Sequence, residues 1–431
     1  MHDLNYILTE LIFILLHFIV LLANYFIIRK NIFYPPVLFS LVWFVIILLH
    51  FIFGFTVLGE LYPLSIDTFV LLLIGTIFFS IGSVIVNLFQ RENDILKSFP
   101  TAVTTSKLKL DTALRMLFLG IAVIGLPLYI QASFRVFLAS QIDNFFVGLR
   151  TELSYGEEDI GPSKYFVSFS FIVFAINYYA FLLDPKKINK IMLIVGFIVA
   201  VVYSVFATGR TYFFMLLAIY LGISFLIKKG FSIKKYAWAL LLFIPIFIFI
   251  GMIYGKGGDA DDSFKNNLNN GSETTAIYLV SSINALDNEL SRNIESNYQG
   301  DNTLLFFVKI GKQLNLIPDK KVGSLLAGFV FVPYPTNVYT VYSPYIRDFG
   351  RLYAFFMIGL FGALHTWVYF KALKTRNLRN TLYYCFLLYP LLMSFFQDQY
   401  MSLFSTWLQM IFYTEIFLLA QKYLPQKKPT V

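Results

Sequence analysis

The stretch that decides the fold class is Tyr165–Leu183, which reads YFVSFSFIVFAINYYAFLL and contains no charged side chain. A helix needs about 20 consecutive apolar residues to cross the hydrocarbon core of a bilayer. Similar runs recur in both directions along the chain, from Leu4–Ile28 near its start to Ser402–Gln421 near its end. The sequence therefore predicts an all-α polytopic membrane protein.

The composition of the 431-residue chain excludes a soluble enzyme. Hydrophobic residues make up 58% and charged residues 14%, whereas soluble domains average about 45–50% and about 25%. The single cysteine, Cys385, lies in an apolar run, which leaves no disulfide framework and no cysteine-based metal site. We interpret the net charge of +9 as a signal of membrane orientation and expect no nucleic-acid partner.

We expect about eleven transmembrane helices, because the apolar runs have the length that a bilayer requires. The first run is too long for the apolar core of a signal peptide and lacks a basic leading region, so we count it as a helix. The expected spans are Leu4–Ile28, Val37–Val57, Thr68–Phe89, Thr112–Phe134, Tyr165–Leu183, Ile191–Ala207, Tyr212–Ile227, Tyr236–Tyr254, Leu352–Phe370, Leu382–Phe396 and Ser402–Gln421.

The connections between the spans predict the orientation. If the N-terminus lies outside, alternate connections fall in the cytoplasm, and each of them carries more Lys and Arg than Asp and Glu, as the positive-inside rule requires. We therefore expect a periplasmic N-terminus and a cytoplasmic C-terminus. The chain then divides into helices in 1–254, a large periplasmic loop in 255–351, further helices in 352–421 and a basic cytoplasmic tail in 422–431.

The large loop is too long for a passive connection, so we expect short helices within it. An apolar stripe predicts one amphipathic helix, with Asp287, Glu289 and Arg292 away from that stripe. A second helix is expected at Leu304–Leu314, capped by Asp301–Thr303 and lying on the bilayer surface or inside the bundle. The stripe of the first helix consists of Leu279, Ile283, Leu286, Leu290 and Ile294.

The familiar catalytic motifs are missing from the sequence. It contains no nucleotide-binding glycine loop, no zinc-protease histidine motif and no hydrolase nucleophile elbow. His17, His50 and His365 lie inside expected spans, where we favour hydrogen-bonded helix contacts over catalysis. We take Glu415 as the only acid well inside a span and favour a local partner for it over a proton relay. We expect no metal and no cofactor.

Arginines near the outer boundary are the remaining candidates for chemistry. Arg210 lies in the segment ATGRT, and Arg347 and Arg351 lie in YIRDFGR, each at the entry to an expected span. Arginine stays charged, and its planar guanidinium can hold a phosphate with two parallel hydrogen bonds. Snorkelling toward water is the plain alternative and has equal weight for any single arginine. Several arginines at this depth suit a lipid-borne diphosphate.

The segment before Arg347 reads VPYPTNVYTVYSPY and covers Val332–Tyr345. Its prolines fix an irregular backbone, and its tyrosines offer flat apolar faces with polar tips. Thr336 and Asn337 add short hydrogen-bonding side chains. Such a strip could stack on sugar rings and bond their hydroxyls. The alternative is an ordinary aromatic belt at the membrane interface.

These residues resemble a family signature. Pro335–Thr340 (PTNVYT), followed by Pro344-Tyr345-x-x-Asp348-Phe349-Gly350, is similar to the signature of bacterial oligosaccharide repeat-unit polymerases, the O-antigen polymerase family. The Thr208–Thr211 segment is similar to a second feature of that family, and the large loop before the last few spans also matches. The resemblance implies a GT-C-like glycosyltransferase bundle in the bacterial inner (cytoplasmic) membrane.

The resemblance also implies a reaction. A growing glycan on undecaprenyl diphosphate would be transferred, without metal, to the non-reducing end of a new lipid-linked repeat on the periplasmic face. The partners would be these undecaprenyl-diphosphate-linked glycans and the lipid bilayer, and the resemblance also allows a polysaccharide chain-length regulator and the repeat-unit flippase. A lipid-linked oligosaccharide flippase or transporter is the alternative. O-antigen ligase is a third, although related ligases carry an outer-loop histidine that this sequence lacks.

We assign roles to the residues on this basis. Arg210 and Arg347 are expected to converge on the donor diphosphate as catalytic residues, because preorganised cations stabilise the departing charge. Asp348 is a third catalytic candidate. It either pairs with Arg347 or Arg351, which we favour, or acts as a base toward the acceptor hydroxyl. The expected substrate-binding residues are Arg351, Thr336, Asn337, Tyr339, Tyr342 and Tyr345.

Overall fold

The computed structural model describes residues 4–28, 31–56, 61–89, 110–156, 158–228, 264–292, 300–316 and 328–423, and most of these are helical. The chain forms two compact units. The first unit consists of Met1–Phe99, Gly257–Lys371 and Leu387–Phe404, and the second of Pro100–Lys256, Ala372–Phe386 and Ser405–Val431. Each unit is therefore assembled from segments that are far apart in the sequence.

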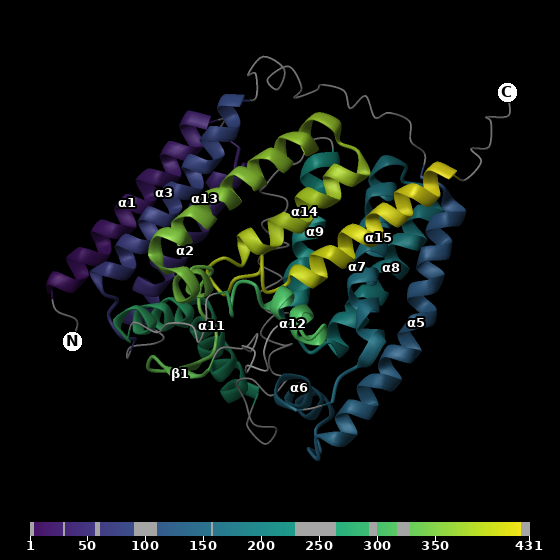
Figure 1. The fold of residues 1–431 in the computed structure, drawn as a ribbon, viewed down its shortest axis with the longest axis horizontal. Coiled ribbons are helices and arrows are strands. Elements are labelled where there is room, and N and C mark those ends of the chain that lie inside the picture. Colours follow the sequence, from purple (N-terminus) through teal and green to yellow (C-terminus); the bar gives the residue numbers. More distant parts are fainter. Residues whose placement is uncertain are drawn as a thin grey trace. The chain divides into compact units, whose positions relative to one another are not determined.

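In the first unit, three long helices pack against one another near the start of the chain (Figure 1). A fourth, α13, approaches α3 closely, because a Cβ atom on Gly82 would collide with the backbone of Gly359, and one on Gly362 with the backbone of Phe79. These glycines therefore permit the contact. The helices of this unit are α1 (Leu4–Ile28), α2 (Pro35–Phe55), α3 (Ile66–Phe89), α11 (Phe264–Arg292), α12 (Leu305–Gln313) and most of α13 (Ser343–Thr375).

The second unit is built around α7 (Tyr165–Leu183), which packs against α5, α8 and α9. Every residue of α7 from Val167 to Ala180 is buried. The uncharged stretch that predicts the fold class is thus the core helix of this unit. Its other elements are α5 (Thr112–Ala139), α6 (Phe145–Tyr155), the 3-10 turn η1 (Gly161–Lys164), α8 (Lys187–Phe206), α9 (Thr211–Ile227) and most of α14 (Leu378–Leu392) and α15 (Phe404–Tyr423).

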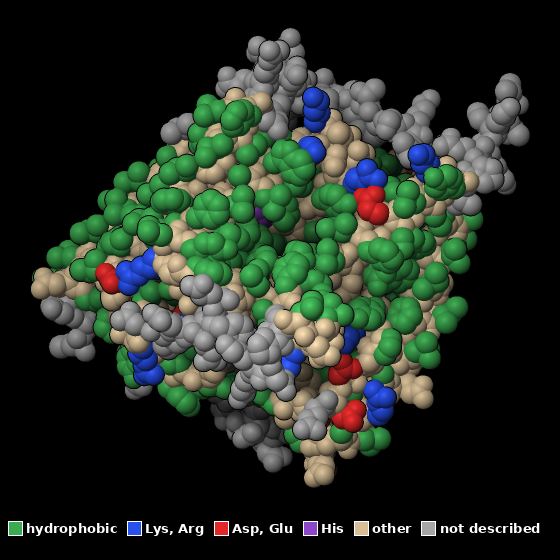
Figure 2. Space-filling view, in the orientation of Figure 1, with side chains coloured by type: hydrophobic (Ala, Val, Ile, Leu, Met, Phe, Trp, Pro, Cys, Tyr) green, Lys and Arg blue, Asp and Glu red, His purple; other side chains and the backbone are tan. Residues whose placement is uncertain are grey.

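The described helices include seven that are long and apolar enough to cross a membrane. Figure 2 shows hydrophobic side chains spread widely over the visible face, with few charged side chains among them. An apolar exterior of this kind requires lipid rather than water around it. The protein is therefore a multi-pass membrane protein. The seven candidate segments are Leu4–Phe26, Pro35–Phe55, Ile66–Phe89, Thr112–Ala139, Gly161–Leu183, Lys187–Phe206 and Ser343–Thr375.

The helices lie where the apolar runs predict them. Each expected span coincides largely with a helix, except Tyr236–Tyr254, which lies outside the described residues. Neither α14 nor α15 is among the seven candidate spans, and α9 is a shorter apolar helix. The number of eleven spans and the GT-C-like bundle therefore stay predictions.

Two acids inside helices show where the sequence interpretation succeeds and where it fails. Glu415 pairs locally with Arg379 (2.6 Å) and accepts a hydrogen bond from Tyr383 (2.6 Å), as we favoured. The expectation that it is the only acid well inside a span is wrong, because Glu10 lies in α1. The Glu10 carboxylate is 2.8 Å from Nδ1 of His50, and both side chains are 2% exposed.

Two helices of the large loop also lie close to their expected positions. The first, α11, runs from Phe264 to Arg292 and buries Ile283, Leu286 and Leu290 of the apolar stripe. The second, α12, begins after Leu304, which makes no side-chain capping bond. The side chains of Asn302 and Thr303 bind the carboxylate of Asp348, and the expected capping by Asp301–Thr303 stays a prediction.

Candidate functional site

The candidate site lies at the start of α13, where the backbone breaks at Gly350. This residue has φ 83° and ψ 175°, so the helix is interrupted between Phe349 and Arg351. A residue with a Cβ atom rarely adopts a positive φ, which explains why glycine stands here. The break leaves Arg347 and Asp348 on a short first segment and Arg351 at the start of the long helix.

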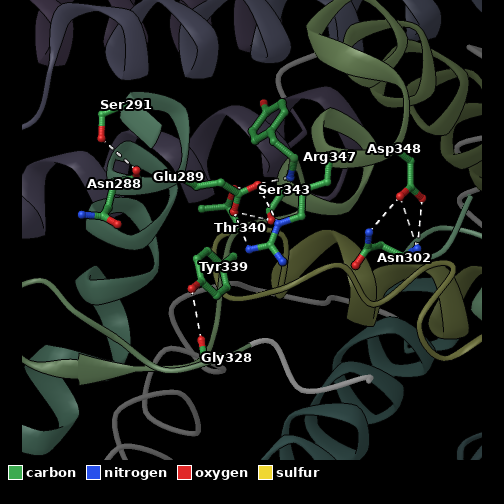
Figure 3. A network of polar contacts seen from close by, with 11 residues as sticks. Asn288, Glu289, Ser291, Asn302, Gly328, Tyr339, Thr340, Ser343, Arg347 and Asp348 are labelled. Carbon is green, nitrogen blue, oxygen red and sulfur yellow. Dashed lines mark hydrogen bonds and ion pairs between the residues drawn. The ribbon is translucent and has the colours of Figure 1, made fainter. Parts of the chain in front are cut away.

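Arg347 is held by a carboxylate of the large loop (Figure 3). Its Nε donates to Oε1 of Glu289 and its Nη2 to Oε2, each at 2.9 Å. Ser343 also donates to Oε2, at 2.7 Å. The Glu289 side chain is 1% exposed and that of Arg347 is 16% exposed. The pair is therefore a two-point contact between α11 and α13 that leaves part of the Arg347 side chain accessible.

Tyr339 covers one face of this guanidinium. The Cζ atom of Arg347 lies 4.7 Å from the centre of the Tyr339 ring, which is within the range of a cation–π contact. The Tyr339 hydroxyl donates to the carbonyl of Gly328 at 3.1 Å, which fixes the ring. Burial raises the pKa of the Tyr339 phenol, so the ring stays neutral at physiological pH.

A small hairpin precedes Tyr339. Strand β1 (Val330–Phe331) pairs antiparallel with β2 (Pro335–Thr336). Thr336 is buried, and its hydroxyl accepts a weak bond from the backbone N–H of Val338 at 3.4 Å, whereas Asn337 is half-buried. The PTNVYT segment thus shapes the turn that delivers Tyr339 to Arg347.

Asp348 points away from Arg347 and binds the segment before α12 (Figure 3). Its Oδ2 accepts from the backbone N–H and the hydroxyl of Thr303, each at 2.7 Å. Its Oδ1 accepts from the side-chain amide of Asn302 at 2.8 Å. The favoured pairing of Asp348 with Arg347 or Arg351 is therefore wrong, and the carboxylate instead anchors this loop segment to α13.

Arg351 makes a different contact. Its Nη2 lies 3.3 Å from Oδ2 of Asp67, and the two side chains are 45% and 69% exposed. An ion pair with this exposure contributes little to stability. Arg351 is thus the most accessible of the candidate arginines, and its ion-pair partner is Asp67 rather than Asp348.

Two of the candidate tyrosines are inside the helix packing. Tyr342 lies 5.4 Å from the ring of Trp43, and the Tyr345 hydroxyl donates to Oδ1 of Asp398 at 3.0 Å. Both side chains are fully buried. A sugar needs an open ring face to stack on, so the geometry does not support this role for Tyr342 and Tyr345.

Sequence analysis missed two buried acids near the site. Glu289 lies off the apolar stripe of its helix, as expected, yet it is buried and contacts Arg347. Asp398 accepts bonds from Tyr345 and from the backbone N–H groups of Tyr400 (3.0 Å), Met401 (3.1 Å) and Ser402 (3.0 Å). Burial raises the pKa of Asp398 above its usual value, although the backbone hydrogen bonds oppose this effect in part. The polar residues Gln397–Gln399 interrupt the sequence between the apolar runs Leu382–Phe396 and Ser402–Gln421. This interruption was the signal that could have identified Asp398.

Arg210 belongs to the second unit, where it precedes the first residue of α9. Thr208 has φ 55°, so the chain turns sharply through Thr208 and Gly209 before the helix begins. The arginine is buried, at 6% exposure. Its convergence with Arg347 stays a prediction.

Comparison with known proteins gives two matches. The chain is 20% identical over 412 residues to a putative O-antigen polymerase of Escherichia coli (strain K12), covering 91% of this chain and 95% of that protein. It is 26% identical over 200 residues to an O-antigen polymerase of Shigella dysenteriae, covering 46% and 48%. No family model and no solved structure matches the chain. Both matches support the resemblance to the O-antigen polymerase family that the sequence signature indicates.

Proposed function

We propose that this protein is a glycosyltransferase that polymerises lipid-linked oligosaccharide repeat units. The match to a putative O-antigen polymerase over nine-tenths of the chain supports the general activity. The observation that carries the site is Arg347, whose guanidinium is held on one edge by Glu289 and whose side chain is 16% exposed. Arginine in such a setting is suited to a phosphate group.

The reaction follows from the chemistry of the substrates. The acceptor hydroxyl attacks the anomeric carbon of the growing glycan, the bond from this carbon to the lipid diphosphate breaks, and the hydroxyl proton leaves to a base or to water. The diphosphate departs as a stable anion, so no acid has to protonate it. Fixed cations at the departing oxygens are the main requirement. Arg347 supplies one, and we propose that Arg210 supplies the second.

The same proposal assigns the remaining candidates. Arg351 is accessible and is suited to the outer part of a phosphate or sugar group, while Asn337 is a half-buried hydrogen-bonding side chain beside the hairpin. Thr336 lies in the hairpin turn, and Tyr339 packs against the guanidinium of Arg347, so both support the site rather than bind the substrate. The oxygens of Asp348 already accept from Asn302 and Thr303, which leaves little room for an acceptor hydroxyl. We therefore propose an anchoring role for Asp348.

We further propose a location and partners. The bias of Lys and Arg toward alternate connections supports a periplasmic N-terminus, a cytoplasmic C-terminus and a site on the periplasmic face of the inner membrane. The lipid would then be undecaprenyl diphosphate, and the enzyme would work beside the repeat-unit flippase and a chain-length regulator.

The test is polymerisation by the purified protein from purified lipid-linked repeats, without added divalent metal. Polymer that lengthens with time, and whose formation depends on Arg347, supports the proposal. A flippase would bind the same headgroup but would break no glycosidic bond. Movement of labelled repeats across proteoliposomes without any polymer would therefore contradict a polymerase and favour the flippase.

A further inference from the structure

The Glu289–Arg347 contact uses only one edge of the guanidinium. An arginine side chain presents a side edge, formed by Nε and Nη2, and an end edge, formed by Nη1 and the second N–H of Nη2. Glu289 accepts from Nε and Nη2 and therefore occupies the side edge. The end edge takes no part in this contact, and it has the spacing that matches two oxygens of one phosphate.

The other directions around Arg347 are restricted. Tyr339 lies over one face of the guanidinium at 4.7 Å, and Figure 3 shows the guanidinium between Glu289 and the Tyr339 ring. Ser343 donates to the same carboxylate that holds Arg347, so Glu289 is itself fixed from α13. The guanidinium therefore has a defined orientation before any substrate arrives.

We infer that Glu289 is a positioning residue, which holds Arg347 so that its end edge faces the departing diphosphate. This inference rests on the proposed function of Arg347. A long arginine side chain loses rotamer freedom when it grips a ligand, and a partner that orients it beforehand removes that cost from the reaction. A donor fixed where negative charge develops also needs no reorganisation during the reaction.

A purely structural tether is the competing explanation, because Glu289 joins α11 to α13. A buried ion pair is weak evidence for stability, since removing two charges from water offsets their attraction.

The chain offers a matched control for tethering. Asp287, on the same helix, accepts from the backbone N–H (2.9 Å) and the hydroxyl of Ser65 and from the hydroxyl of Thr68 (2.6 Å). Asp287 thus anchors α11 to the start of α3 and not to α13.

The experiment compares Glu289→Gln, Asp287→Asn and Arg347→Ala in polymerisation by the full-length purified protein, together with thermal unfolding in detergent. We expect Glu289→Gln to lower kcat by about tenfold with little change in KM, because one charge-assisted hydrogen bond is weakened. Asp287→Asn should lower the unfolding temperature and leave kcat within about threefold of the wild-type value. A threefold change corresponds to less than about 1 kcal/mol in activation free energy. In the Arg347→Ala background, Glu289→Gln should cause no further loss.

The charge-reversed double variant Glu289→Arg/Arg347→Glu separates the two explanations. It restores an ion pair between the helices but presents a carboxylate where the phosphate would bind. Positioning predicts recovered thermal stability without recovered activity, whereas a tether predicts recovery of both. If Glu289→Gln yields no folded protein, Glu289→Asp, which keeps the charge on a shorter side chain, should show a smaller loss of kcat.

The outcomes also distinguish this inference from the proposed function. A normal rate for Glu289→Gln, with a slow Arg347→Ala, overturns the positioning role and leaves the diphosphate site intact. Recovery of activity in the charge-reversed variant, which has a carboxylate at position 347, overturns both the positioning role and the diphosphate site. A normal rate for Arg347→Ala overturns the diphosphate site itself, and the positioning role with it.

Discussion

The carboxylate of Asp348 accepts hydrogen bonds from both the backbone N–H and the hydroxyl of Thr303, each at 2.7 Å. This contact joins the first segment of α13 to the residues before α12, while the adjacent Arg347 turns to α11. Two neighbouring residues thus hold two different parts of the large loop. The start of α13 therefore anchors the large loop to the helices of the first unit.

Replacing Asp348 tests whether it anchors the loop or acts as a base. Asp348→Ala leaves buried donors of Thr303 and Asn302 without their acceptor, which costs about 1–3 kcal/mol for each unsatisfied group. We expect a lower unfolding temperature and a proportionate loss of activity. Asp348→Asn keeps one acceptor oxygen and should retain most of both. A folded Asp348→Asn protein with no detectable polymerisation would instead identify Asp348 as the base.

Gly350→Ala tests the break in α13. No atom lies within 4 Å of the position that a Cβ atom would occupy, so the substitution introduces no clash. The φ of 83° and ψ of 175° nevertheless place this position in a region that only glycine adopts readily, which costs a residue with a Cβ atom about 1–3 kcal/mol. We expect a modest fall in the unfolding temperature and a larger fall in activity, because the orientation of Arg347 depends on this turn. Equal activity in the variant and the wild type would show that the break does not set the site.

The buried pair of Glu10 and His50 gives a stability prediction that is independent of the site. His50 contacts Glu10 through Nδ1 at 2.8 Å and Asn284 of α11 through Nε2 at 3.2 Å. His50→Ala would leave the Glu10 side chain buried without its main partner, at a cost of about 3–5 kcal/mol. The double variant Glu10→Gln/His50→Ala should recover part of this loss. If His50→Ala unfolds at the wild-type temperature, the pair does not stabilise the first unit.

The orientation can be tested with reporter fusions. Fusions after Lys187 and Arg376 should report a cytoplasmic location, because basic connections stay inside. A fusion near Asn270 should report a periplasmic location. A cytoplasmic result near Asn270 would place the whole site on the opposite face of the membrane and contradict the proposed reaction.

The sequence predicts the helices well but the contacts of the site poorly, and the reasons are physical. Long apolar runs specify spans directly, as Tyr165–Leu183 illustrates. In contrast, Arg347 and Asp348 were expected to interact because they are adjacent, yet side chains at i and i+1 of a helix do not face each other. Gly350 also removes the helical spacing that would bring Arg351 beside Asp348.

Glu289 was missed for a related reason. The apolar stripe of α11 identifies one buried face and gives no partner for the acids that lie off that stripe. This helix is buried on more than one side, however, and its polar face meets Ser65, Thr68 and Arg347. Aromatic periodicity likewise cannot tell whether a tyrosine faces lipid, sugar or protein, which is why Tyr342 and Tyr345 were assigned to sugar binding.

The central claim is that Arg347 stabilises the departing diphosphate, and the initial rate of polymer formation by Arg347→Ala tests it most directly. Lys309→Ala is the matched control, because it removes one exposed positive charge from the same loop. We predict that Arg347→Ala lowers the rate by about one to two orders of magnitude, as expected for a lost charge-assisted hydrogen bond. Arg347→Lys should recover only part of it. The control should stay near the wild-type rate. Polymer formation by folded Arg347→Ala at the wild-type rate would contradict the account.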